Sequence, residues 1–141
     1  MEITNATLFD LDSIYALNSS LLADGESWEK SMLEKDFPLS KYLVAKIDGK
    51  VVGYLSYRVV LDECEIFQIC VDESFQRQGI ASKLFESLLE SENVEKIFLE
   101  VSSLNDKAIA FYTSKGFTII REIENYYGNH SAFNMVKVQQ K

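Results

Sequence analysis

The feature that most constrains the fold lies near the middle of the chain. Residues 66–71 form an apolar run that favours a β-strand, and the polar segment DESFQRQ follows it. After Gly79 the apolar residues recur at helical spacing, since Ile80, Leu84 and Leu88 are each four positions apart. The pattern predicts a strand, a loop and then a helix that begins at or near Gly79.

The start of this predicted helix has a chemical use. The first N–H groups of a helix have no partner within it and lie at the positive end of its dipole, so they stabilise an anion such as phosphate. Gly79 has no Cβ and lets a phosphate approach the backbone, while Arg77 adds a positive charge and Gln78 an amide. The sequence therefore indicates a phosphate site, although an ordinary glycine turn would show the same pattern.

The segment Q-R-Q-G-I-A resembles the motif Q/R-x-x-G-x-G/A of the GNAT family of N-acetyltransferases, with Gln76, Gly79 and Ala81 at the defined positions. The stretches VVLDECEIFQICVDESFQRQG and LEVSSLNDKAIAFYTSKGF are similar to the bacterial ribosomal-protein-alanine N-acetyltransferases of that family. The resemblance covers about residues 51–127 and implies acetyl-CoA as the cosubstrate. It implies that the pyrophosphate is held by Arg77, Gln78, Gly79, Ile80, Ala81 and Ser82.

Length and charge limit the class of protein. A chain of 141 residues predicts one domain, residues 1–141. A net charge of −8 argues against nucleic-acid binding and suits a cationic acceptor such as an amine. No apolar run approaches a membrane span, and MEITNATLFD lacks the basic and apolar regions of a secretory signal. We therefore expect a cytoplasmic protein with no membrane partner.

The cysteines and the histidine predict neither a disulfide nor a metal site. Cys64 and Cys70 are six residues apart in one predicted strand, which is too far for a disulfide, so both are expected as core thiols. Two cysteines and one histidine match no recognised metal-ligand spacing.

Periodicity and breaker residues predict eleven elements along the chain. Strands are expected at residues 2–7, 42–47, 51–61, 66–71, 94–101, 117–127 and 132–138, and helices at 10–23, 28–35, 79–90 and 105–115. Local signals mark their limits: Ser27 as a helix cap, turns at 48–50 and 62–63, a bulge at Gly53, and Gly116 after a helix.

The predicted order is βααβββαβαββ, a mixed α/β sheet with helices on both faces. The helical connection between the fourth and fifth strands makes these two strands parallel. The GNAT fold has the same order, and the resemblance implies that the fourth and fifth strands splay apart at their C-terminal ends.

Glu100 lies near the end of the fifth predicted strand, between Leu99 and Val101. A carboxylate in an apolar strand belongs either to a solvated face or to a site. An ammonium must lose a proton before it can be acetylated, and a carboxylate can take that proton directly or through water. The resemblance assigns the role of general base to Glu100.

Asn105 and Tyr112 are seven residues apart, so two helical turns place them on one face, with the small Ala108 between them. The spacing alone fits equally a tyrosine at the edge of the core with a hydrated hydroxyl. The resemblance implies that Tyr112 donates a proton to the coenzyme A thiolate and that Asn105 contacts the cofactor.

Three residues at the end of the fourth strand, Ile69, Cys70 and Val71, are the other expected cofactor contacts. The resemblance implies that their backbone N–H groups bind the pantetheine and polarise the thioester carbonyl, which would stabilise an oxyanion. A covalent acetyl group on Cys70 is a weaker alternative, since no histidine that could activate the thiol lies nearby in sequence.

The acceptor side carries the weakest signals. Residues 125–127 resemble a tyrosine pair of the family that helps bind a peptide, but the hairpin after them looks shorter, and 129–131 replace its acidic residues. The expected acceptor is the N-terminal alanine of a ribosomal protein. The alternatives are a small-molecule amine, a lysine side chain, or a coenzyme A-binding module without catalysis. His130 is expected at the surface, and Trp28 as a core anchor or a substrate contact.

Overall fold

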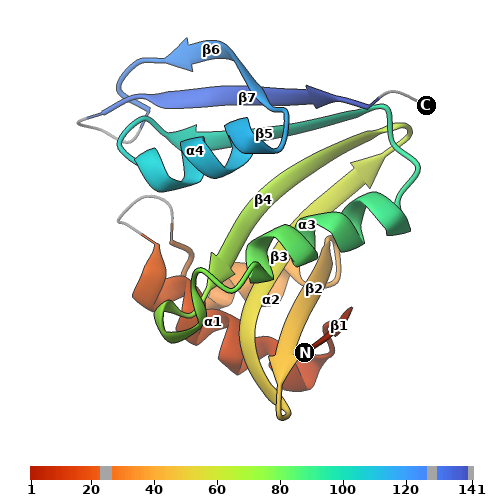
Figure 1. Ribbon diagram of the computed structural model, residues 1–141. Helices are drawn as coiled ribbons and strands as arrows, with labels where there is room; N and C mark the ends of the chain where they lie inside the picture. The colour runs from red at the N-terminus through yellow and green to blue at the C-terminus, as the bar shows by residue number, and fades with distance from the viewer. Residues whose placement is uncertain (23–26, 127–129, 140–141) are drawn as a thin grey trace. The chain divides into compact units, whose positions relative to one another are not determined.

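The computed structural model describes residues 1–22, 27–126 and 130–139. Its strands are β1 (Glu2–Asn5), β2 (Lys41–Ile47), β3 (Lys50–Val60), β4 (Glu63–Val71), β5 (Lys96–Ser102), β6 (Thr118–Ile123) and β7 (Ala132–Val138) (Figure 1). Its helices are α1 (Leu11–Leu21), α2 (Lys30–Asp36), α3 (Ile80–Ser91) and α4 (Asp106–Ser114), with short 3-10 turns η1 (Leu8–Asp10) and η2 (Glu73–Phe75). The predicted order of strands and α-helices is confirmed.

The strands form a mixed sheet. Among the described residues their hydrogen-bonded order is β1-β2-β3-β4-β5-β7-β6. β4 and β5 are parallel, as the helical connection predicts, and their ladder pairs Glu63–Ile66 with Lys96–Leu99. The neighbouring pairs β1–β2, β2–β3, β5–β7 and β6–β7 are antiparallel. The last residues of β4 lie outside the β4–β5 ladder.

The chain divides into two compact units, and β4 contributes to both. Unit 1 comprises Met1–Arg58 and Phe67–Asn93, and unit 2 comprises Val59–Ile66 and Val94–Lys141.

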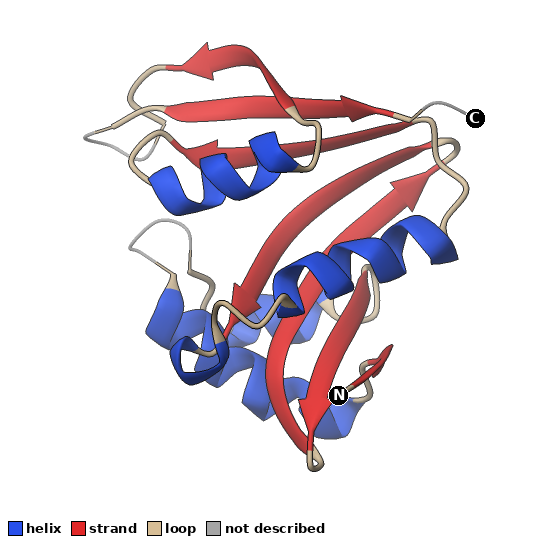
Figure 2. Ribbon diagram, viewed as in Figure 1, coloured by secondary structure: helices blue, strands red, loops and turns tan. Residues whose placement is uncertain are grey.

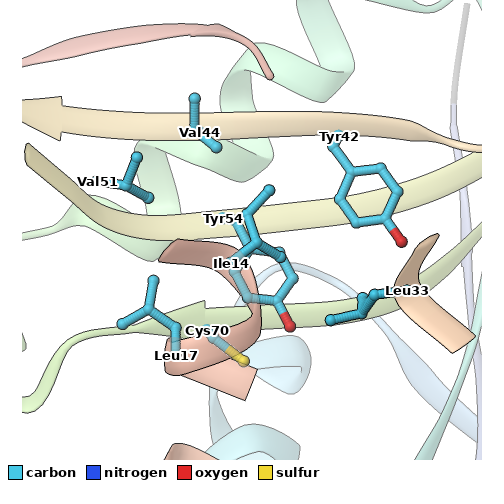
Figure 3. Close-up of a cluster of buried hydrophobic side chains, with 8 residues drawn as sticks. All are labelled: Ile14, Leu17, Leu33, Tyr42, Val44, Val51, Tyr54 and Cys70. Atoms are coloured by element: carbon cyan, nitrogen blue, oxygen red, sulfur yellow. The ribbon is translucent and has the colours of Figure 1, made fainter. Parts of the chain in front are cut away.

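In unit 1, helices cover both faces of β2 and β3 (Figure 2). On one face, a buried cluster joins α1 and α2 to the strands, and Figure 3 shows its members: Ile14, Leu17, Leu33, Tyr42, Val44, Val51, Tyr54 and Cys70. On the other face, Lys41 Nζ and Tyr57 Oη both reach Glu92 Oε2, at 2.7 and 2.8 Å, where α3 ends. Side chains alternate between the two faces along each strand, so each strand contributes to the packing on both faces.

A buried polar network fastens α1 to the strands of unit 1. Asn18 is fully buried, and its Nδ2 donates to Tyr54 Oη at 3.0 Å and to Gln68 Oε1 at 2.8 Å. Asn18 Oδ1 accepts the backbone N–H of Trp28 at 2.7 Å, and the Trp28 ring lies 6.2 Å from that of Phe67. Trp28 therefore packs against the core of unit 1, in keeping with its expected role as an anchor.

Two predicted features are confirmed, the turn that leads into β3 and the bulge within it. Asp48 and Gly49 form the two-residue turn between β2 and β3, and both have a positive φ, of 51° and 79°. The β2–β3 register shifts beside Gly53, which pairs with Ala45 while Val51 pairs with Lys46. This shift is the bulge that a glycine inside the strand predicts.

In unit 2, strands β5, β7 and β6 are antiparallel neighbours, and α4 supplies aromatic side chains. Tyr112 is only 5% exposed, and its ring meets that of Phe117 edge-on at 5.4 Å between centroids. Gly116 follows the helix with a φ of 96°, as expected for the residue after a helix C-cap.

Some predicted limits are wrong. Ser27 does not cap a helix, because α2 begins at Lys30 with Glu29 as its N-cap, while the Trp28 N–H is held by Asn18. The turn before β4 consists of residues 61–62 rather than 62–63, since Leu61 adopts a φ of 57°. The first helix ends at Leu21 and the sixth strand at Ile123, so their predicted ends at residues 23 and 127, which themselves lie outside the described residues, are placed too late.

Candidate active site

The loop from β4 to α3 is tied down at both ends of η2. The Asp72 carboxylate accepts the backbone N–H of Ser74 at 2.9 Å. Gln76 Nε2 donates to the carbonyl of Val71, the last residue of β4, at 3.1 Å. The motif residue Gln76 therefore fastens the loop to the strand, a role that its position in the motif did not reveal.

The two residues that lead into α3 have left-handed backbones. Arg77 has a φ of 67° and Gly79, the N-cap, a φ of 76°. The left-handed conformation costs Arg77 about 1–2 kcal/mol, whereas glycine adopts it freely. Strain of this kind, when it is kept, is often found at functional sites.

The amino end of α3 is prepared for an anion. Among the described residues, no side chain caps the helix at Gly79, and a Cβ at that position would meet nothing within 4 Å. The N–H groups of Ile80, Ala81 and Ser82 open the helix, at the positive end of its dipole. Together with Arg77 and the amide of Gln78, they form a group that suits a pyrophosphate.

Gly53 brings the start of α3 close to the sheet. A Cβ on Gly53 would lie 3.0 Å from the carbonyl oxygen of Cys70, 3.3 Å from Cγ2 of Ile80 and 3.4 Å from Cγ2 of Val71. The backbone N–H of Asp72 also donates to the carbonyl of Val52 at 2.8 Å. The end of β4 and the first residue of α3 are therefore positioned by the absence of a side chain in β3.

The predicted pantetheine contacts, Ile69, Cys70 and Val71, are the last three residues of β4 and belong to unit 1. They lie outside the β4–β5 ladder. Cys70 is buried, and so is Cys64, and the two do not form a disulfide.

The predicted catalytic residues Glu100, Asn105 and Tyr112 all belong to unit 2. Glu100 is exposed on β5 and pairs across the strands with Asn134 of β7. The hydroxyl of Tyr126 donates a hydrogen bond to the Glu100 carboxylate, and this bond, with the negative charge of Glu100, raises the pKa of Tyr126. The sequence predicts Tyr126 as a contact of the acceptor peptide and carries no signal for its bond to Glu100.

Asn105 is the N-cap of α4 rather than a residue within it. Its Oδ1 accepts the backbone N–H of Ala108 at 3.1 Å. A cofactor contact from this side chain would therefore use Nδ2. Tyr112 lies seven residues further along, with its ring buried between those of Phe111 and Phe117, so it is a core residue as well as the candidate acid.

Two further polar residues in unit 2 lie beside Glu100 and had no sequence signal. Glu65 of β4 pairs with Phe98, two residues before Glu100, and its charge also acts on Tyr126. Asn134 has a buried Oδ1 that has no hydrogen-bond partner among the described residues. Only the strand register places these side chains with Glu100.

The described residues contain neither a metal-ligand cluster nor a membrane-spanning helix. Among residues 1–22, 27–126 and 130–139, no group of three or more His, Cys, Asp or Glu side chains is placed to hold a metal ion. None of the helices described there has the length and apolar character needed to cross a membrane. His130 is half-buried rather than fully at the surface.

Relatives at the sequence level are acetyltransferases. The [ribosomal protein bS18]-alanine N-acetyltransferase of Escherichia coli (strain K12) is 42% identical over 83 residues, 57% of this chain and 56% of that protein. The matched segment thus spans little more than half of that relative. The N-alpha-acetyltransferase of Sulfurisphaera tokodaii is 27% identical over 143 residues, 90% of this chain and 86% of that protein.

Solved structures share the whole fold. The ribosomal-protein-S18-alanine N-acetyltransferase from Escherichia coli matches with a TM-score of 0.88 and 29% identity, covering 99% of this chain and 94% of that one. Ard1 from Thermoplasma volcanium matches with a TM-score of 0.87 and 29% identity, covering 99% and 98%. The model of the Acetyltransferase (GNAT) family matches residues 8–117 of the 141, so the chain belongs to that family.

Proposed function

We propose that the protein transfers an acetyl group from acetyl-CoA to a primary amine, and that the acceptor is the N-terminal α-amine of a protein. The observation that carries the proposal is the amino end of α3, which follows the left-handed residues Arg77 and Gly79 and has no side-chain cap, in a chain of this family. An uncapped helix start preceded by an arginine suits the pyrophosphate of coenzyme A.

The residues present fit the cosubstrate. The N–H groups of residues 79–82 and the side chains of Arg77 and Gln78 would hold the pyrophosphate, while the backbone of residues 69–71 would bind the pantetheine. Asn105 would add a contact through Nδ2, because its Oδ1 is used by the helix cap. Acetyl-CoA supplies an acetyl group activated as a thioester.

The chain supplies the proton transfers. Glu100 takes a proton from the acceptor ammonium, so that the amine lone pair becomes available for attack. Tyr112 gives its phenolic proton to the leaving thiolate. The base and the acid are thus two separate groups of unit 2.

The acceptor class rests on the relatives and on proton affinity. Of the two relatives compared by sequence, one is named as an N-alpha-acetyltransferase and the other as an alanine N-acetyltransferase for ribosomal protein bS18. An α-amine has an ordinary pKa near 7.7–8.0 and lysine one near 10.4, so an exposed carboxylate deprotonates the α-amine at lower cost. The net charge of −8 attracts a cationic peptide, and the cytoplasm is the expected location.

The test is mass spectrometry of a peptide panel incubated with acetyl-CoA. Peptides with an N-terminal alanine should be acetylated at the α-amine, and Glu100→Gln should reduce turnover about a hundredfold or more while leaving coenzyme A affinity unchanged. Glu122→Gln is the matched control, because Glu122 is exposed on β6 and pairs with Phe133, one position from the row that contains Glu100. Equal activity of Glu100→Gln and wild type would remove the base assignment.

The same panel separates the alternatives. Acetylation of polyamines or of lysine side chains in preference to the N-terminal peptides would favour a different acceptor, as the short connection before β7 suggests. Binding of coenzyme A without transfer to any amine would favour a module that binds the cofactor and does no chemistry.

A further inference from the structure

Gln68 fastens the last part of β4 to the core of unit 1. Its side chain is buried, and its Oε1 accepts from Asn18 Nδ2 at 2.8 Å and from the hydroxyl of Tyr54 at 2.9 Å. Asn18 Nδ2 also donates to the Tyr54 hydroxyl at 3.0 Å. Three side chains, one each from α1, β3 and β4, therefore close a ring of hydrogen bonds, and all three belong to unit 1.

The place of Gln68 in the strand connects this ring to the cofactor. Gln68 lies beyond the residues that pair with β5 and directly before residues 69–71, whose backbone is the proposed pantetheine contact. Among residues 67–71, Gln68 and Cys70 are the buried ones, and they are two positions apart, so they share one face of the strand. Cys70 packs in the same cluster as Tyr54 (Figure 3). This part of β4 is therefore held on its buried face by one packed thiol and one hydrogen-bonded amide.

The hydrogen bonds fix the position of the strand more strictly than apolar packing does. Oε1 of Gln68 uses both of its acceptor sites on donors from other elements, so a shift of β4 along its own axis would break both bonds. A buried amide that loses its partners is costly, because no water replaces them. An apolar side chain of similar size adapts to such a shift, and methionine does so most easily. The amide of Gln68 thus sets the position of β4 relative to α1.

The donor to Gln68 is itself held firmly. Asn18 is fully buried, and its Oδ1 accepts the backbone N–H of Trp28 at 2.7 Å. Its amide therefore has a partner on each side, the segment before α2 on one and the ring with Tyr54 and Gln68 on the other. Asn18 cannot follow a movement of β4 without breaking a bond elsewhere.

Building on the proposed function, we propose that Gln68 is a positioning residue for the pantetheine and thioester of acetyl-CoA, and that it acts through the backbone of residues 69–71. Its side chain faces the buried ring with Asn18 and Tyr54. By holding β4 in place, it keeps the N–H groups of the following residues where they bind the pantetheine. Such groups bind and polarise a substrate only when they are held close to the productive geometry.

The test compares Gln68→Met with Tyr54→Phe as its matched control. Each variant removes two of the three bonds in the ring, so both should lower the urea midpoint by a similar amount. Tyr54→Phe leaves the bond between Asn18 and Gln68 intact, whereas Gln68→Met frees β4. We expect Gln68→Met to weaken coenzyme A binding in calorimetry by about tenfold, and kcat/KM for acetyl transfer by about as much, with changes of no more than about twofold in Tyr54→Phe.

A second ligand separates positioning from general damage. Adenosine 3′,5′-bisphosphate carries the nucleotide part of coenzyme A but no pantetheine, so Gln68→Met should bind it as tightly as wild type does. Equal losses of affinity for both ligands would show that the whole of unit 1 is disturbed and would overturn the proposal. Coenzyme A affinity and kcat/KM that are the same in Gln68→Met and Tyr54→Phe would also overturn it. If Gln68→Met does not fold, Gln68→Asn, which draws the amide back by one methylene, is judged by the same criteria.

A third readout needs neither ligand nor turnover. Amide hydrogen exchange of residues 69–71 should be faster in Gln68→Met than in Tyr54→Phe by about tenfold, although the two variants lose similar global stability. Equal exchange in both would show that Gln68 does not hold this part of β4. If wild type binds no coenzyme A, or if Arg77→Ala binds it as tightly as wild type, the proposed function fails. If both of those checks pass and only Gln68→Met behaves like its control, the role of Gln68 alone fails.

Discussion

Gly53→Ala is the substitution that links the packing of unit 1 to cofactor binding. The new methyl group would lie 3.0 Å from the carbonyl oxygen of Cys70 and within 3.4 Å of side-chain methyls on Val71 and Ile80. The carbonyl belongs to the backbone of β4 and cannot rotate away. Either β3 and β4 separate locally or the first turn of α3 moves outward by a few tenths of an ångström.

The size of the effect follows from these contacts. Adding a methyl group to a packed interior lowers the free energy of unfolding by about 1–3 kcal/mol. Alanine offsets about 0.4–1 kcal/mol of this loss, because it restricts the unfolded chain more than glycine does. We expect Gly53→Ala to lower the free energy of unfolding by about 1–2 kcal/mol in urea denaturation. A shift of the α3 amides should also weaken coenzyme A binding by roughly tenfold, or about 1.4 kcal/mol, in calorimetry.

Gly49→Ala separates the two effects. Gly49 has a φ of 79° and open space around its Cα, so alanine there is strained by about 1–2 kcal/mol without touching α3. The two variants should lose similar stability, but only Gly53→Ala should bind coenzyme A less tightly. If Gly53→Ala were as stable as wild type and bound coenzyme A equally well, the close approach of β3, β4 and α3 would not be what positions the site.

Three other measurements test separate features. Arg77→Gly and Arg77→Ala remove the same charge and should weaken coenzyme A binding equally in calorimetry, but the glycine variant should be more stable to urea by about 1 kcal/mol because it accepts the positive φ. Asn134→Leu should raise the free energy of unfolding by about 1 kcal/mol, since it removes a buried oxygen without a partner; a loss of stability would contradict this. Burial raises the pKa of both Tyr42 and Tyr54, and its effect is larger than that of their hydrogen bonds. Above pH 10 the native protein therefore keeps protons that the unfolded chain loses, and urea unfolding from pH 9 to 11 should show stability falling, with a shallower fall in Tyr54→Phe.

The sequence predicts the fold well where a local signal has a single structural solution. Asp48 and Gly49 both need positive φ in a two-residue hairpin, and Gly116 is the usual residue after a helix. Leu61 carries no such signal, because leucine avoids a positive φ and adopts it here only where the chain turns into β4. Ser27 was a plausible cap, but the tertiary bond from the Trp28 N–H to Asn18 takes precedence over the local preference.

The sequence predicts individual residues of the site but not the contacts between them. The motif identified Arg77 and Gly79 because the backbone of a phosphate loop has strict local requirements. The bond between Tyr126 and Glu100 depends on the register of β5, β6 and β7, which no local pattern sets. Glu100 and Tyr112 lie in unit 2, and their catalytic roles stay predictions that the proposed variants can test.

Strand β4 alternates buried and more exposed side chains along its whole length, and this regularity limits how the chain can vary. Gln68 is buried and accepts from Asn18, whereas its neighbour Phe67 is only partly buried. In a regular strand neighbouring side chains lie on opposite sides. Deleting or inserting one residue here would exchange inside for outside along half of β4. Homologues should therefore tolerate many replacements in this segment but preserve its length.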